Sequence, residues 1–294
     1  MPIVKADNEL RVYQCSMWDD FVSRVKQARV QNNGKGGFSR PTHVFFRGHS
    51  DPTWLLSASA ERNLTLTQME KQETDVVHPH LRMENGVDWY ISECNELLAR
   101  FSQTAHGLSE LPENHPDSWI TGRHYGLLSP YLDWTSSPFV AAFFALQKLY
   151  EKLQCFRSSY TPGCPPCTIW AICLWKEAAE KDIFEYWEPR TVHGSRARAQ
   201  RGAFTKLLSE NYIDILSYFK SRGIAHYLER YDLCLNDGER ALMDLELMNI
   251  NYSSLFPDIM GAAQDANLER RFLGLRELSE TAHNSETNSG AVGF

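Results

Sequence analysis

The stretch His43-Val44-Phe45-Phe46-Arg47-Gly48 is the part of the sequence that is most informative about fold and function. Its first four residues include β-branched and aromatic types that favour a strand. An arginine at the end of an apolar strand commonly presents its guanidinium group to a phosphate or carboxylate, and a following glycine lets another group approach the backbone closely. The stretch therefore predicts a strand that ends beside an anionic ligand, with Arg47 and Gly48 at the binding site.

A second informative stretch, Leu132-Asp133-Trp134-Thr135-Ser136-Ser137-Pro138, follows some 85 residues later. It leads into the apolar run 139–146, which has the length and density of a buried helix. Ser136 or Ser137 would cap this helix, and Pro138 suits its first turn.

The polar residues of this second stretch have more than one reading. Thr135 and Ser136 serve either as a helix cap alone or as ligand contacts. Asp133 could hold Arg47 in place. A serine hydrolase is a weaker alternative, because the chain has no G-x-S-x-G elbow. It stays an alternative because any of the ten histidines could activate a serine nucleophile.

Length and composition indicate an ordered globular protein. The 294 residues are 43% hydrophobic and 12% aromatic, enough for one large domain or two small ones. The formal charge of −7 and the pI of about 5.8 argue against wholesale binding to nucleic acid or an anionic membrane. Neither a membrane-spanning run nor a signal sequence is evident, so we expect a cytoplasmic protein without a membrane partner.

The seven cysteines do not form a disulfide framework, since their number is odd and they are scattered. The pair in Cys164-Pro165-Pro166-Cys167 resembles a metal knuckle. One such pair is not a complete ligand set, and Cys173 falls inside an apolar strand, so no metal is predicted. Glycine-rich Rossmann and Walker A motifs are also absent from the sequence.

Periodicity and loop-forming residues predict the other elements of the chain. These are a strand over 9–14, a helix starting at Ser16, a helix over 87–108, a loop over 109–118, a helix over 138–152 and a central strand over 168–175.

A basic, polar loop is predicted over residues 189–201. Its positively charged and imidazole side chains are Arg190, His193, Arg196, Arg198 and Arg201. This loop and Arg47 are two separate sources of positive charge, an arrangement that suits a diphosphate. A solvated surface loop is the equally weighted alternative, and any nucleic-acid contact would be restricted to residues 190–201.

With these residues assembled, the chain resembles the FRG domain family, named for the Phe-Arg-Gly present here as residues 46–48. Order and approximate spacing of the family's motifs are kept from about residue 40 to 270. The matching segments are Trp54-Leu55-Leu56, Glu61-Arg62, Arg123-His124-Tyr125-Gly126-Leu127, Leu132-Asp133-Trp134-Thr135, Ala141-Ala142-Phe143-Phe144-Ala145, Ala199-Gln200-Arg201-Gly202-Ala203-Phe204-Thr205 and Leu255-Phe256-Pro257-Asp258-Ile259-Met260-Gly261. Arg123 departs from the family, which usually has glutamine there.

The resemblance extends by fold-level analogy to the ADP-ribosyltransferase superfold. It implies an α+β fold, with a split, strongly bent β-sheet flanked by helices. We divide the chain into an N-terminal strand and helix extension over residues 1–39, an FRG domain over 40–279 and a disordered tail over 280–294.

The same analogy implies an NAD-consuming enzyme, either an NAD glycohydrolase or an ADP-ribosyltransferase, acting as an intracellular toxin or anti-phage defence effector. NAD would be the substrate, no metal would be needed, and a macromolecular acceptor or an antitoxin would be a further partner. By analogy Arg47 corresponds to the first motif of the superfold, Thr135 and Ser136 to the second and Gln200 to the third. Glutamine at the third position resembles some NAD-hydrolysing toxins.

The implied catalytic residues are Arg47, Thr135 and Gln200. The implied NAD-binding residues are Arg47, Gly48, Tyr125, Thr135, Ser136 and Arg198, with Tyr125 stacking near the nicotinamide. Tyr125 could instead pack in the core. Two alternatives stay open: a non-catalytic sensor that binds a nucleotide or a phage component, and a nuclease or RNA-modifying activity that acts through the basic loop.

Overall fold

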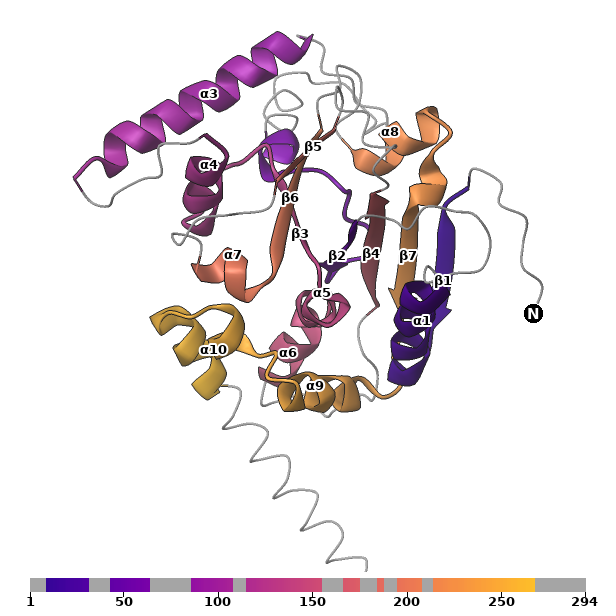
Figure 1. Cartoon of the computed structure of the whole chain (residues 1–294). Helices are drawn as coiled ribbons and strands as arrows, with labels where there is room; N and C mark the ends of the chain where they lie inside the picture. Colours follow the sequence, from indigo (N-terminus) through magenta and orange to yellow (C-terminus); the bar gives the residue numbers. More distant parts are fainter. Residues whose placement is uncertain are drawn as a thin grey trace, which may run out of the picture.

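The computed structural model describes residues 9–31, 43–63, 86–107, 115–154, 166–174, 184–187, 195–207 and 214–267. Within these residues the fold is a mixed sheet with helices packed around it (Figure 1). The strands are β1 (Arg11–Cys15), β2 (His43–His49), β3 (Leu132–Thr135), β4 (Cys167–Leu174), β5 (Phe184–Trp187), β6 (Gly202–Leu207) and β7 (Leu228–Leu233).

The strands follow the order β1-β7-β4-β2-β3-β6-β5. β1 runs parallel to β7, and the other neighbours are antiparallel. The registered pair that joins β2 to β3 is Phe46 with Thr135, whereas β2 and β4 pair from His43 to His49. The sheet is therefore narrow at this junction, and its two wings diverge from it (Figure 1). The predicted α+β class, with a sheet flanked by helices, is confirmed, and the likeness to the ADP-ribosyltransferase superfold stays a prediction.

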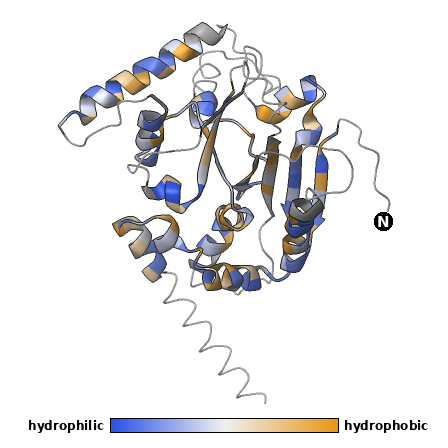
Figure 2. Ribbon diagram, viewed as in Figure 1, coloured by the Kyte–Doolittle hydropathy of each residue, from blue (hydrophilic) through white to orange (hydrophobic). Residues whose placement is uncertain are grey.

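Helices cover both wings of the sheet. They are α1 (Trp18–Gln31), α3 (Gly86–Ala105), α4 (His115–His124), α5 (Pro138–Ala145), α6 (Gln147–Gln154), α7 (Ser195–Ala199), α8 (Ile215–Ser221), α9 (Gly238–Leu247) and α10 (Tyr252–Leu255), with the short 3-10 helix η1 (Ala225–Tyr227). Figure 2 shows α3 alternating between hydrophilic and hydrophobic positions, as expected for a helix with one packed face. That face buries Tyr90, Cys94 and Leu98.

The helix after β3 begins as predicted. The Ser137 hydroxyl accepts a hydrogen bond from the Val140 amide at 3.4 Å, and Pro138 lies in the first turn. The predicted continuous helix over 138–152 is interrupted at Leu146, where α5 ends and α6 follows. α5 is buried along most of its length and contributes Phe143 to the largest part of the core.

Gly48 lies directly under α5. A Cβ at this position would be 1.9 Å from the carbonyl oxygen of Ala141 and 2.6 Å from the amide nitrogen of Ala145. The group that approaches this glycine closely is therefore the backbone of α5, which accounts for the glycine without a ligand.

Two predicted loops are wrong over the part that the structure describes. Residues 115–118, placed in the loop 109–118, open α4, because a proline in the first helical turn is compatible with a helix. Residues 195–199, placed in the basic loop, form α7, where alanine and arginine both favour helix. Figure 2 shows α7 as strongly hydrophilic.

The remaining predicted elements agree with the structure to within a few residues. β4 matches the predicted central strand and lies between β7 and β2. The N-terminal extension supplies β1, an edge strand of the same sheet, and α1. The tail over 280–294 lies outside the described residues.

Candidate functional site

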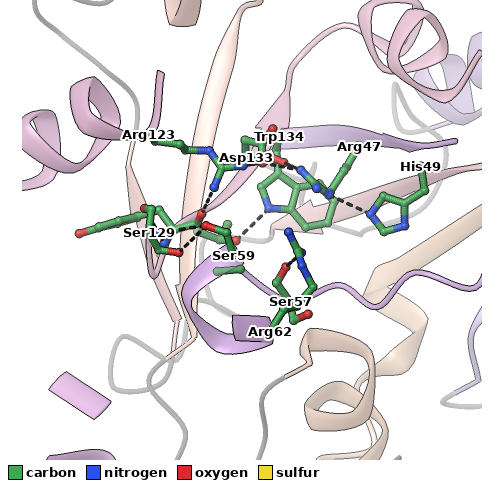
Figure 3. A network of polar contacts seen from close by, with 12 residues as sticks. Arg47, His49, Ser57, Ser59, Arg62, Arg123, Ser129, Asp133 and Trp134 are labelled. Carbon is green, nitrogen blue, oxygen red and sulfur yellow. Dashed lines mark hydrogen bonds and ion pairs between the residues drawn. The ribbon is translucent and has the colours of Figure 1, made fainter. Parts of the chain in front are cut away.

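Arg47 lies on β2 and contacts β3 next to it (Figure 3). Its Nη1 donates hydrogen bonds to the backbone oxygen of Asp133 at 2.8 Å and to Oδ1 of the same residue at 2.5 Å. Its Nε donates to Nε2 of His49 at 2.9 Å. The Arg47 side chain is 14% exposed. The alternative in which Asp133 holds Arg47 in place is thus confirmed as a contact.

Asp133 also pairs with Arg123, which comes from the last turn of α4. Nη1 of Arg123 donates to the carbonyl oxygen of Tyr131 at 2.8 Å, and Nη2 pairs with the Asp133 carboxylate. Burial alone would raise the pKa of Asp133, but the guanidinium groups of Arg123 and Arg47 hold it well below its usual range. This carboxylate is therefore ionised at neutral pH and forms ion pairs with both arginines.

A third guanidinium group, that of Arg62, comes from the helical residues 59–63. Its Nη1 donates to the carbonyl oxygen of Ser57. The pKa of Arg62 is lowered, first by burial and then by the charges of Arg47 and Arg123, so its positive charge acts on theirs. We call Arg47, Arg62, Arg123 and Asp133 the arginine cluster.

The arginine cluster carries excess positive charge. It has three guanidinium groups and one carboxylate, and within the described residues no second carboxylate pairs with any of the three arginines. Anions are favoured where positive charge is only partly compensated in a partly buried site. The arrangement suits a ligand with two negative charges.

His49 extends the cluster along β2. It is 1% exposed, and its pKa is lowered to about 3, mainly by burial and then by Arg47, so the imidazole is neutral at pH 7. A neutral imidazole can accept the hydrogen bond from Arg47. The Trp54 ring packs edge to face against the His49 ring, with 5.9 Å between the ring centres, and Trp54 is 52% exposed.

The side chain of Thr135 contacts the backbone of Gln200. The Thr135 hydroxyl donates to the backbone oxygen of Gln200 at 2.7 Å and accepts from the amide of Ser137 at 3.1 Å. The Gln200 side chain donates to the carbonyl oxygen of Leu255 at 3.1 Å. Both polar side chains therefore already have partners that connect β3, α7 and α10.

The other predicted site residues surround this junction. The backbone amide of Ser136 donates to the carbonyl oxygen of Arg201 at 3.0 Å. Arg198 is exposed on α7. Tyr125 follows α4 and is 82% exposed, so the alternative in which it packs in the core is wrong. Arg196 is held by Asp258 and lies 5.4 Å from the centre of the Phe256 ring.

Arg62, Arg123 and His49 were not predicted as site residues. His49 had a usable signal, because residues two apart on a strand share a face of the sheet and His49 follows Arg47 at that spacing. Arg62 and Arg123 were visible only as parts of longer motifs. Their contribution depends on how their charges act on Arg47 and Asp133, which no local pattern reveals.

Metal ligands do not gather in the part of the chain that the structure describes, where no group of three or more histidine, cysteine, aspartate or glutamate side chains could hold an ion. Cys167 is buried in β4, and Cys164, Arg190 and His193 lie outside the described residues. None of the described helices is long and apolar enough to cross a membrane.

A buried carboxyl group lies next to the cluster in sequence. Glu61 is 4% exposed, and its Oε2 accepts a hydrogen bond from the amide of Ala58 at 2.6 Å. Burial raises the pKa of Glu61 to about 8, so the folded protein holds this proton at pH 7.

We predict that Glu61→Gln removes a pH dependence of stability. In the unfolded chain the group loses its proton near 4.5 and in the folded protein near 8. Between these values the folded state binds more protons, so the free energy of unfolding falls as pH rises, by up to about 1.4 kcal/mol per pH unit. Glutamine cannot titrate, so the variant should gain stability relative to the parent protein as pH rises.

Urea unfolding of both proteins at pH 5, 6.5 and 8 measures this difference. Comparing the two proteins at each pH cancels the separate contribution of His49, whose lowered pKa makes stability fall as pH drops below about 6.5. Parallel stability profiles for the two proteins would show that Glu61 does not titrate in this range.

Comparison with known proteins gives one family match, over part of the chain. The model of the FRG domain family matches residues 42–153. This part of the chain is similar to FRG domains, and it contains the whole arginine cluster as well as Thr135 and Tyr125. Gln200 and Arg198 lie beyond the match. No curated protein and no solved structure matches the chain significantly.

Proposed function

We propose that this protein is an NAD-consuming enzyme, an NAD glycohydrolase or an ADP-ribosyltransferase, whose site includes the arginine cluster. The observation that carries the proposal is the excess positive charge of three guanidinium groups around one carboxylate. The diphosphate of NAD supplies the two negative charges that would balance it. Arg47 lies at the centre of the cluster, where it would bind the diphosphate.

The surroundings of the cluster support the placement of the rest of NAD. Arg123 and His49 lie at opposite ends of the network (Figure 3). An exposed aromatic residue belongs to each end, since Tyr125 follows Arg123 in the chain and Trp54 contacts His49. A diphosphate flanked by two planar rings has the same order of groups as NAD. In our proposal Tyr125 stacks on the nicotinamide.

Thr135, Ser136 and Gln200 would act on the nicotinamide ribose. Thr135 and Ser136 position it, and the Gln200 amide exchanges its hydrogen bond to Leu255 for one to a ribose hydroxyl as the bond to nicotinamide breaks. Such a contact stabilises the oxocarbenium-like transition state. Arg198, exposed on α7, would contribute further positive charge toward the diphosphate.

The biological setting is part of the proposal and rests on the resemblance alone. It comprises a cytoplasmic toxin or anti-phage effector, NAD as substrate, and an acceptor or antitoxin as a macromolecular partner.

A second candidate function is a non-catalytic sensor that binds a nucleotide or a phage component at the same cluster. The observation that favours it is that Thr135 and Gln200 both have internal partners. An amide also cannot act as a general base, and the carboxylate of Asp133 is a weak base because Arg123 and Arg47 hold its pKa well below its usual range. A sensor would bind its nucleotide or phage component without converting it to a product.

Nicotinamide release separates the two candidates. Purified protein is incubated with NAD, with and without cell extract and infected-cell extract, and nicotinamide is followed by chromatography. Release supports the enzyme. NAD binding without release under all of these conditions would leave the sensor as the function.

We predict that Gln200→Ala lowers the rate of nicotinamide release by about 10²- to 10³-fold with little change in NAD affinity, because one hydrogen bond to developing charge contributes about 2 to 4 kcal/mol. The lost contact with Leu255 should cost only about 1 kcal/mol of stability. The matched control is Gln14→Ala on β1, where the amide donates to Asp232 at 2.9 Å, far along the sheet order. Equal rates for both variants would remove Gln200 from the mechanism.

A further inference from the structure

Arg62 differs from the other two arginines of the cluster in how its charge is balanced. Arg47 and Arg123 both pair with the carboxylate of Asp133. The acceptor of Arg62 is a backbone oxygen, that of Ser57, and no carboxylate within the described residues pairs with it. A guanidinium group has five N–H donors, so Arg62 carries donors besides the one that bonds to Ser57.

Arg62 is also the most accessible arginine of the cluster. The residue is exposed, whereas the side chains of Arg47 and Arg123 are 14% and 20% exposed. Figure 3 shows the Arg62 side chain extending toward that of Arg47. The pKa of Arg62 is lowered, first by the partial burial of its guanidinium group and then by the charges of Arg47 and Arg123, and an anion at this point would offset the repulsion among the three guanidinium groups.

Trp54 offers an exposed ring at the same site. It packs edge to face on His49, which accepts a hydrogen bond from Arg47. The charge of Arg62 also acts on His49, so Arg62 and Trp54 both lie near this imidazole. Tryptophan that is half exposed beside positive charge is well suited to stack on a nucleobase.

We propose that Arg62 and Trp54 are ligand-contacting residues of this site, with Arg62 donating to a phosphate oxygen and Trp54 stacking on the base of the same nucleotide. The inference rests on the proposed function and deepens it, because it assigns the adenosine half of NAD to the Trp54 side of the cluster. Both Arg47, whose side chain is 14% exposed, and the exposed Arg62 would then bind the diphosphate.

Isothermal titration calorimetry of the full chain with ADP-ribose and with inorganic pyrophosphate tests the two contacts. Arg62→Gln should weaken binding of both ligands by about 10- to 100-fold, because a charge-assisted hydrogen bond is lost. Trp54→Ala should weaken ADP-ribose by about tenfold and leave pyrophosphate within twofold, because only ADP-ribose has a base to stack. Arg240→Gln on α9, which pairs with Asp19, is the matched control and should change neither affinity.

Arg62→Lys keeps a donor for Ser57 and replaces Arg62→Gln in the titrations if Arg62→Gln does not fold. It should lose affinity for both ligands because lysine cannot form the forked contact. Unchanged affinities in the Arg62 variants would overturn the inference. So would equal weakening of both ligands by Trp54→Ala, or binding of neither ligand by the parent protein. ADP-ribose binding without nicotinamide release from NAD would contradict only the enzymatic function. Nicotinamide release by the parent protein, together with unchanged ligand affinities in the Arg62 variants, would contradict only this inference.

Discussion

Arg47→Ala should lower NAD affinity by about 100-fold or more while the protein keeps its cooperative unfolding transition. The substitution removes the central guanidinium group of the cluster, and charge-assisted contacts to a diphosphate are among the stronger polar interactions. The fold should survive because Asp133 keeps its ion pair with Arg123. The imidazole of His49 loses its donor, at a cost of about 1 to 2 kcal/mol.

Calorimetry with NAD and urea unfolding measure the two effects separately. Arg47→Lys should restore little of the affinity, because an ammonium group cannot reach Asp133 and His49 in the same forked geometry. The outcome against this assignment is a variant that loses its cooperative transition. In that case the role of Arg47 is structural, and it consists of the ion pair with Asp133.

Much of the fold around the site followed from local patterns in the sequence. Runs of β-branched and aromatic residues predicted β2 and β4, and the serine and proline before an apolar run predicted the start of α5. These elements are buried and strongly patterned, so local preference and tertiary packing agree. The pairing of Asp133 with Arg47 was also foreseen as one alternative.

The elements that were missed have ambiguous local signals. Pro116 was taken as a loop residue, although it lies in the first turn of α4, and α7 was hidden in a basic stretch. Missing α4 mattered for the site, because α4 carries Arg123 to Asp133. The contact joins a helix terminus to a strand, and its geometry depends on how α4 packs rather than on any sequence period.

Gly48 shows how one residue can fit two explanations from sequence alone. The sequence predicted that this glycine lets a ligand approach, and the structure places the α5 backbone there. Both explanations require the absence of a side chain. They differ in what a methyl group would disturb, and a substitution can therefore distinguish them.

Gly48→Ala should destabilise the protein by about 3 kcal/mol or more, which lowers Tm by roughly 6 to 12 °C for a chain of this size. The added Cβ would lie 1.9 Å from the Ala141 carbonyl oxygen, so α5 would have to move away from β2. That movement would open contacts of buried core residues such as Phe46 and Phe143.

Gly107→Ala is the matched control for this substitution. Gly107 has a φ of +81°, and a Cβ there would meet nothing within 4 Å, so its replacement by alanine carries backbone strain without a collision and should cost about 1 kcal/mol. Thermal unfolding of both variants compares the two costs, and titration with ADP-ribose adds a separate measure of the site. A Gly48→Ala protein with the parental Tm and no ADP-ribose binding would favour the ligand explanation, because the glycine would then be needed for the approach of a nucleotide and not of α5.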